Sequence, residues 1–138
     1  MKRLLIGLWL LLLLPNPARG ADAPGITTTV LAKTGASWNG VPLPPYPHSS
    51  PEITILRITI PAGTSLPLHT HPVINAGVLL SGELTVVTED NKTLHLKAGD
   101  PIVEVVNTWH QGTNPGNTPA EILVFYAGTA DTPITVKK

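Results

Sequence analysis

The stretch GTSLPLHTHPVINAGVLLSG, from Gly63 to Gly82, contains two of the five histidines of the chain, His69 and His71, only one residue apart. Side chains two residues apart on a β-strand point to the same face of the sheet. If a strand lies here, the two imidazoles can bind one metal ion. An isolated pair of this kind can equally be the polar end of a strand.

A second stretch, GDPIVEVVNTWHQGTN from Gly99 to Asn114, contains a third histidine, His110, in turn-rich surroundings after an apolar segment. Three neutral imidazoles that converge from two strands would form a mononuclear metal site, with positions left open for water or substrate. Spacing alone leaves both the metal site and the polar strand end open, because histidines also serve as plain surface residues.

These two stretches together resemble the two signature motifs of the cupin superfamily, over roughly half of the chain that would follow a cleaved leader. The matching positions are Gly63, His69, His71, Gly82, Gly99, His110 and Asn114. The segment between the motifs, Glu83 to Ala98, has the short length of compact single-domain (type 2) microbial cupins. The resemblance implies a small jelly-roll β-barrel and one divalent metal ion (Fe, Mn, Zn, Ni or Cu) bound by His69, His71 and His110.

The chain departs from the motifs at three positions, and one of them bears on the metal. Asn75 stands where the family has its carboxylate ligand, a glutamate, while Val105 and Asn107 replace a proline and a glycine. An amide oxygen is neutral and a weaker ligand than a carboxylate, so a site completed by Asn75 would bind a metal less tightly. The resemblance places Asn75 at the fourth position of the metal site.

Glu104 is the carboxylate that could compensate, since it stands alone in the otherwise apolar run PIVEVVN. Burial of an unpaired charge is costly. Glu104 therefore either faces outward and pairs with Lys97 or Arg57, or faces inward as the missing ligand or as a catalytic general base. His48 and His95 lack a partner pattern and are predicted to lie away from any ligand.

The remainder of the sequence predicts an all-β protein of two facing antiparallel sheets, because fifteen prolines and twelve glycines divide it into short apolar segments. The predicted strands are Thr27 to Leu31, Glu52 to Ile60, Ile74 to Leu80, Glu83 to Glu89, Thr93 to Lys97, Ile102 to Val106 and Ala120 to Ala127. The predicted core residues are Ile53, Ile55, Ile58, Ile60, Val78, Leu80, Leu84, Val86, Ile102, Val106, Leu123 and Phe125. Apolar residues on the outer faces lead us to expect a homodimer formed by sheet packing.

The N-terminal part of the chain predicts export. A basic start, an apolar run of 11 residues from Leu4 to Leu14 and a small-residue stretch are typical of a secretory signal peptide, and the run is too short for the roughly 20 residues of a membrane span. Cleavage is expected after Gly20, with Ala23 as the alternative. The predicted organisation is a signal peptide at 1–20, an N-terminal strand and proline-rich arm at 21–50, and the barrel at 51–138. The proline-rich part, Ala32 to Ser50, is predicted to cover the barrel, with a ligand lid as the alternative.

The composition restricts the classes of partner. The chain that follows residue 20 has six Lys and Arg against nine Asp and Glu, and it has no cysteine. Neither a nucleic-acid partner nor a membrane surface is indicated by that balance, and a secreted or periplasmic protein of this kind is held by packing rather than by disulfides.

Three functions remain open at this point. The first is an exported metalloenzyme that acts on a small oxygen-bearing organic ligand, with dioxygenase-like oxidoreductase chemistry implied first by the resemblance and isomerase chemistry second. The second is a non-catalytic module that binds a metal or a small ligand, which the replacement of the family's glutamate by Asn75 modestly favours. The third, a purely structural barrel without metal, fits poorly with the retained histidines.

Overall fold

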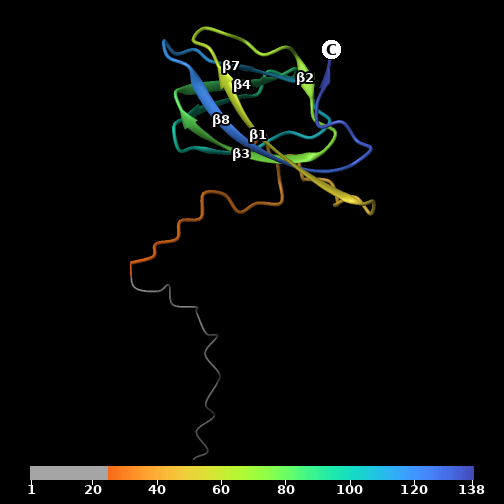
Figure 1. Cartoon of the computed structure of the whole chain (residues 1–138). Coiled ribbons are helices and arrows are strands. Elements are labelled where there is room, and N and C mark those ends of the chain that lie inside the picture. Colours follow the sequence, from red (N-terminus) through yellow and green to blue (C-terminus); the bar gives the residue numbers. More distant parts are fainter. Residues whose placement is uncertain (1–24) are drawn as a thin grey trace, which may run out of the picture.

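The computed structural model describes residues 25–138, and these fold into two antiparallel sheets that face each other (Figure 1). One sheet has four strands in the order β1-β8-β3-β6, and the other has five in the order β5-β4-β7-β2-β9. The strands are β1 (Pro51–Ile60), β2 (His69–Thr70), β3 (Ile74–Ser81), β4 (Glu83–Thr88), β5 (Thr93–Lys97), β6 (Pro101–Val103), β7 (His110–Thr113), β8 (Ala120–Thr129) and β9 (Val136–Lys137). The predicted all-β fold of two antiparallel sheets is confirmed.

The long predicted strands agree with β1, β3, β4, β5 and β8, whereas three differences concern short segments. Residues 27–31 form no strand, and Ile26, Val30 and Leu31 are exposed there. The strand predicted at Ile102 to Val106 ends at Val103, and the next two residues, Glu104 and Val105, are both buried, which breaks the alternation of a strand. The strands β2, β7 and β9 have two to four residues, too few for an alternation pattern to predict them.

The core lies between the sheets, and its composition corrects part of the predicted list. The predicted residues Ile60, Leu84, Val86 and Ile102 are buried, but Ile53, Ile55, Leu80 and Phe125 are exposed. Val78, Val106 and Leu123 are only partly buried. Successive side chains alternate between the two faces of a strand. On β8 the inward residues are consequently Ile122, Val124 and Tyr126, and Leu123 and Phe125 face outward.

The exposed row on the four-stranded sheet is apolar. Ile55 on β1 is paired with Phe125 on β8, which is paired in turn with Ala76 on β3. A homodimer formed by sheet packing would bury this outward apolar row. The homodimer stays a prediction.

The replaced glycine of the second motif has a direct structural explanation. Asn107 adopts a positive φ of 53°. Asparagine is one of the few residues other than glycine that tolerates this left-handed conformation. The turn also places the Asn107 N–H on the carbonyl of His71, at 2.9 Å, so the substitution preserves the connection between the two motifs.

Asn114, the last residue of the second motif, is fully buried and holds the loop before β8. Its side-chain amide donates to the carbonyls of Ile60, Pro61 and Thr118, while its oxygen accepts the N–H of Gly116 at 2.9 Å. Asn114 is therefore a structural residue and lies outside the candidate site.

Part of the proline-rich arm lies against the barrel. Trp38 packs against the core and Ser37 is buried, but Tyr46 is 74% exposed, although the prolines on both sides of it line a hollow with Val73 and Ala127. No helix in residues 25–138 is long and apolar enough to cross a membrane. The predicted signal peptide at 1–20 lies outside the described residues.

The two glycines that bound the first motif provide a test of what each position requires. Both have positive φ, 67° at Gly63 and 75° at Gly82, but a Cβ at Gly82 would lie 2.8 Å from Ala120 Cα and 2.9 Å from Pro119 O. A Cβ at Gly63 would meet nothing within 4 Å. Gly82→Ala should lower the free energy of unfolding by about 2–4 kcal/mol, from backbone strain and steric overlap together, and Gly63→Ala by about 1–2 kcal/mol from strain alone. Urea denaturation measures both, and equal losses would contradict the steric argument.

Candidate metal centre

His69, His71 and His110 converge at one end of the barrel interior, although two of them come from short strands and His71 from the loop after β2. In β2 and β7, His69 and His110 are directly paired, which brings the two motifs together. The three ring centroids lie 4.4–5.0 Å apart, and one potential ligand atom of each ring lies within 4.8 Å of the other two. His71 and His110 are buried and His69 is partly buried. The predicted convergence of the three imidazoles is present in the structure.

Each imidazole is oriented by a main-chain carbonyl on its Nδ1 atom. His69 Nδ1 is 2.7 Å from the carbonyl of Pro67, and His110 Nδ1 is 2.9 Å from that of Thr108. His71 Nδ1 is 2.7 Å from the carbonyl of Ile134, far along the chain. A carbonyl oxygen only accepts hydrogen bonds, so each Nδ1 carries the proton and each Nε2 of a neutral ring keeps a free lone pair.

This pattern fits a metal ion. Metal-binding histidines ordinarily donate their other ring N–H to a carbonyl or carboxylate, which fixes the tautomer and the ring orientation. In this structure His110 Nε2 is buried and has no hydrogen-bond partner, which is costly for a polar atom unless a ligand satisfies it. The donor set of three imidazoles is the set expected for zinc and for other first-row transition metals.

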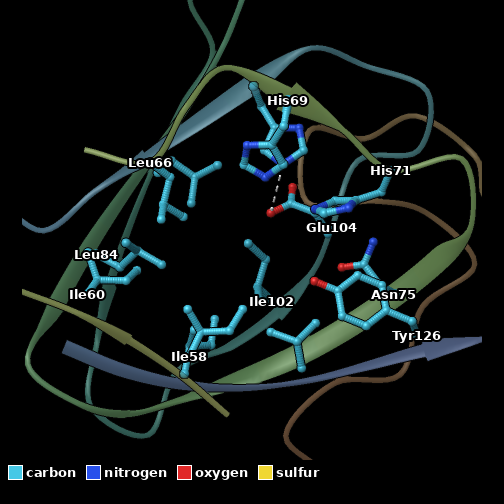
Figure 2. A pocket seen from close by; sticks show the side chains of 15 residues that line it. Ile58, Ile60, Leu66, His69, His71, Asn75, Leu84, Ile102, Glu104 and Tyr126 are labelled. Atoms are coloured by element: carbon cyan, nitrogen blue, oxygen red, sulfur yellow. Dashed lines mark ion pairs between the residues drawn. The ribbon is translucent and has the colours of Figure 1, made fainter. Parts of the chain in front are cut away.

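Glu104 faces inward, which decides between the two orientations left open by the sequence. Its side chain is buried, and its Oε2 atom lies 3.7 Å from His110 Nε2 (Figure 2). The outward pairing with Arg57 does not occur, because Arg57 pairs with Glu121 at 3.8 Å. Three imidazole lone pairs and a carboxylate oxygen thus face one region of the cavity. A cation bound there would compensate the buried negative charge of Glu104.

Asn75 lies near the same cavity but is oriented by another contact. Its side-chain N–H donates to the carbonyl of Val73, at 3.3 Å, and the residue is buried on β3 opposite Tyr126. Figure 2 shows Asn75 beside Tyr126, below His71, whereas Glu104 reaches in among the imidazoles. Of the two candidates for the fourth position, Glu104 has an oxygen that faces a histidine nitrogen, whereas the Asn75 amide is held by the carbonyl of Val73.

The cavity has one polar and one apolar end. The polar end holds the histidines, Glu104, Asn75 and Tyr126, and the other end is lined by aliphatic side chains (Figure 2). A wider hollow of about 310 Å³ adjoins it, with His69, His71, Tyr126, Thr135 and Lys137 in its wall. A small ligand with a polar head and an apolar body matches this shape.

Burial favours the neutral, metal-binding form of His69 and His71. Desolvation lowers the pKa of His71 to about 4 and also lowers the pKa of His69, although the hydrogen bonds to Ile134 and Pro67 oppose these shifts. The Tyr126 hydroxyl has a raised pKa, mainly because it is buried and secondly because of the charge of Glu104. It therefore stays protonated and available as a hydrogen-bond donor.

Several contributing residues could not be found from the sequence. Trp38 donates its indole N–H to Glu104 across 66 positions, and Ile134 and Thr135 contact His71 from the end of the chain. No local pattern marks such distant pairs. His95 is exposed and bonds to Thr85, His48 is exposed, and Trp109 contacts Lys138 instead of lining the cavity.

The chain belongs to the cupin domain family, whose model matches residues 56–126, just over half of its length. No curated protein matches the chain. Among solved structures, it is similar to an oxalate oxidase in complex with the substrate analogue glycolate, at 26% identity and a TM-score of 0.53 over 62% of this chain and 45% of that one.

Two further solved structures share the fold. A Klebsiella pneumoniae protein with a double-stranded β-helix domain is 20% identical, with a TM-score of 0.52 over 66% of this chain and 86% of that chain. The Lactobacillus farciminis oxalate decarboxylase formate complex is 22% identical, with a TM-score of 0.53 over 62% of this chain and 26% of that chain. The chain spans less than half of the length of either oxalate enzyme.

Removal of one imidazole tests the metal centre directly. The purified protein should contain up to one divalent metal ion per chain. Loss of an outer-shell partner weakens metal binding by roughly 10- to 100-fold, so His69→Ala, which removes a direct ligand, should weaken it by more than that. Elemental analysis after dialysis measures the content, with the exposed His95→Ala as the matched control. Absence of metal from the wild-type protein after incubation with Mn²⁺, Fe²⁺, Co²⁺, Ni²⁺, Cu²⁺ and Zn²⁺ in turn would exclude the site.

The low pKa of His71 predicts a loss of stability in acid for the chelator-treated protein. The unfolded chain takes up a proton near the ordinary value of 6.5, whereas folded His71 resists protonation down to about 4. Stability from this residue is therefore complete above pH 6.5 and is lost as the pH falls toward 4, by about 3 kcal/mol. Urea denaturation at pH 7.5 and pH 4.5 should show a smaller acid loss for His71→Gln than for wild type or His95→Gln. An equal loss in all three proteins would contradict this origin.

Proposed function

We propose that this protein is an exported, mononuclear metal-dependent cupin that acts on a small oxygen-bearing organic ligand by dioxygenase-like oxidoreductase chemistry. The observation that carries the proposal is the set of three Nδ1-to-carbonyl hydrogen bonds, which leaves three Nε2 lone pairs directed at one buried region beside Glu104. The similarity to an oxalate oxidase that binds glycolate supports a small oxygen-bearing ligand. Export rests on the sequence pattern of residues 1–20.

The metal, when bound, would act as a Lewis acid or activate dioxygen at its open positions. His69, His71 and His110 would hold it, and the hydrogen-bonded Nδ1 atoms keep these rings from turning away. The aliphatic walls of the cavity exclude water from the ligand's apolar part. Tyr126, which stays protonated, offers a hydrogen bond to a ligand oxygen.

Glu104 would have one of two roles. As a metal ligand, its Oε2 would supply the carboxylate that the family places at the position of Asn75. As a general base, the same atom would accept a proton from the bound ligand. Lys137 lines the wider hollow and, in addition to burial, its positive charge contributes to the lowered pKa of His69, so an acidic ligand is favoured there.

The alternative is a non-catalytic module that binds a metal or a small ligand, and the position of Glu104 bears on it. If Glu104 is the fourth ligand, the described residues around the metal contain no other carboxylate to act as a base, and a binding module becomes the better account. If Glu104 is a base, an enzyme is favoured, and isomerase chemistry remains an alternative to oxidation.

Glu104→Gln separates these roles, because the amide keeps the shape and the acceptor oxygen but loses the charge. We expect Mn²⁺- or Fe²⁺-loaded protein to consume dioxygen with oxalate or glycolate. If Glu104 is a base, the variant should keep its metal and lose roughly 100- to 10,000-fold in rate; if it is a ligand, metal content should fall. An oxygen electrode and elemental analysis measure the two outcomes, with the exposed Glu83→Gln as control. Full metal content with no oxygen uptake in wild type would contradict oxidation of these two acids.

A further inference from the structure

The two oxygens of the Glu104 carboxylate have different surroundings. Oε1 accepts two hydrogen bonds of 2.8 Å each, one from the Trp38 indole N–H and one from the main-chain N–H of Val105. Oε2 is the atom that faces His110 Nε2. A free carboxylate can rotate and exchange its oxygens, so these bonds decide which oxygen is presented to the histidines.

Trp38 reaches Glu104 from a segment outside the matched family domain. Residues 35–43 form a tight hairpin, with hydrogen bonds of 2.9 Å from Ser37 N to Val41 O and from Leu43 N to Gly35 O. We refer to residues 35–43 as the arm hairpin. The hairpin attaches to the end of β6, because the main-chain N–H of Trp38 donates to the carbonyl of Val103 at 2.8 Å.

A second contact of the arm hairpin is made to Glu104 itself. The buried Ser37 hydroxyl donates to the Glu104 main-chain carbonyl at 2.9 Å. The hairpin therefore holds both the main chain and the side chain of Glu104. The Val105 N–H belongs to the next residue and moves with Glu104, so the hydrogen bond from the arm hairpin is the one that ties Oε1 to a distant part of the described chain.

We propose that Trp38 is a positioning residue for the metal centre, whose indole N–H holds Glu104 Oε1 so that Oε2 stays directed at the metal. The inference rests on the proposed function, because it requires the site to bind a metal, and of the two roles given there for Glu104 it takes that of the metal ligand. Outer-shell hydrogen bonds of this kind orient a ligand and raise the affinity of the site. The arm hairpin thereby supplies part of a site whose histidines all lie in the cupin domain.

A double-mutant cycle on Co²⁺ affinity tests the proposal in the purified protein. Trp38→Phe keeps an aromatic ring but removes the donor, and it should weaken Co²⁺ binding by about 10-fold. Glu104→Gln should weaken binding strongly when Trp38 is present and clearly less when it is Phe, because the carboxylate is then no longer held. Isothermal titration of the four proteins gives the coupling, and the Co²⁺ absorption spectrum reports the change in ligands. Independent, additive losses would overturn the proposal, since a purely structural Trp38 predicts them.

Matched controls separate this inference from the proposed function. Trp109→Phe, the other tryptophan in the described residues, should leave Co²⁺ affinity unchanged, and Trp38→His, which restores a ring N–H, should recover part of it. If wild type binds no Co²⁺, the proposed function and the positioning role fail together; if it binds with additive losses, only the positioning role fails. If Trp38→Phe does not fold, Trp38→Leu, which also lacks the donor, replaces it in the same cycle, and an additive result with Glu104→Gln overturns the proposal equally.

Discussion

Three hydrogen bonds from imidazole Nδ1 atoms to main-chain carbonyls are the interaction on which the site depends. They fix the ring orientations without any charged partner, and they direct three lone pairs into a buried region that also receives the Glu104 carboxylate. Two of the carbonyls lie two residues before their histidines, so the local path of the chain determines these two hydrogen bonds. The third belongs to Ile134, and tertiary structure alone brings it to His71.

The departure at Asn75 becomes intelligible once Glu104 is located. The family's carboxylate position is on β3, within the first motif, whereas Glu104 follows β6, within the second motif. The strands β3 and β6 are neighbours in one sheet, and the Glu104 N–H donates to the Asn75 carbonyl at 3.0 Å. A carboxylate can therefore approach the same cavity from the adjacent strand, and an amide at Asn75 avoids a second negative charge beside it.

Local patterns in the sequence predicted the long strands and the three histidines, because alternation and motif spacing act over short distances. The orientation of Glu104 could not be predicted, since its run is apolar on both sides and its partner Trp38 lies 66 residues away. The predicted core failed where it combined Ile53 and Ile55 with Ile58 and Ile60, which occupy opposite faces of β1. Strict alternation of inward and outward residues along β1 would have avoided this error. The contact from Trp38 to Glu104, in contrast, can be known only from the three-dimensional structure.

The carbonyl of Ile134 also has a consequence for the order of events during folding. His71 acquires its orientation only when a residue 63 positions later has reached it. A partly synthesised chain can bring together His69 and His110 through β2 and β7, but His71 is still free to rotate. The complete set of three oriented imidazoles therefore forms only after residues 134–137 have been synthesised and have packed beside β2.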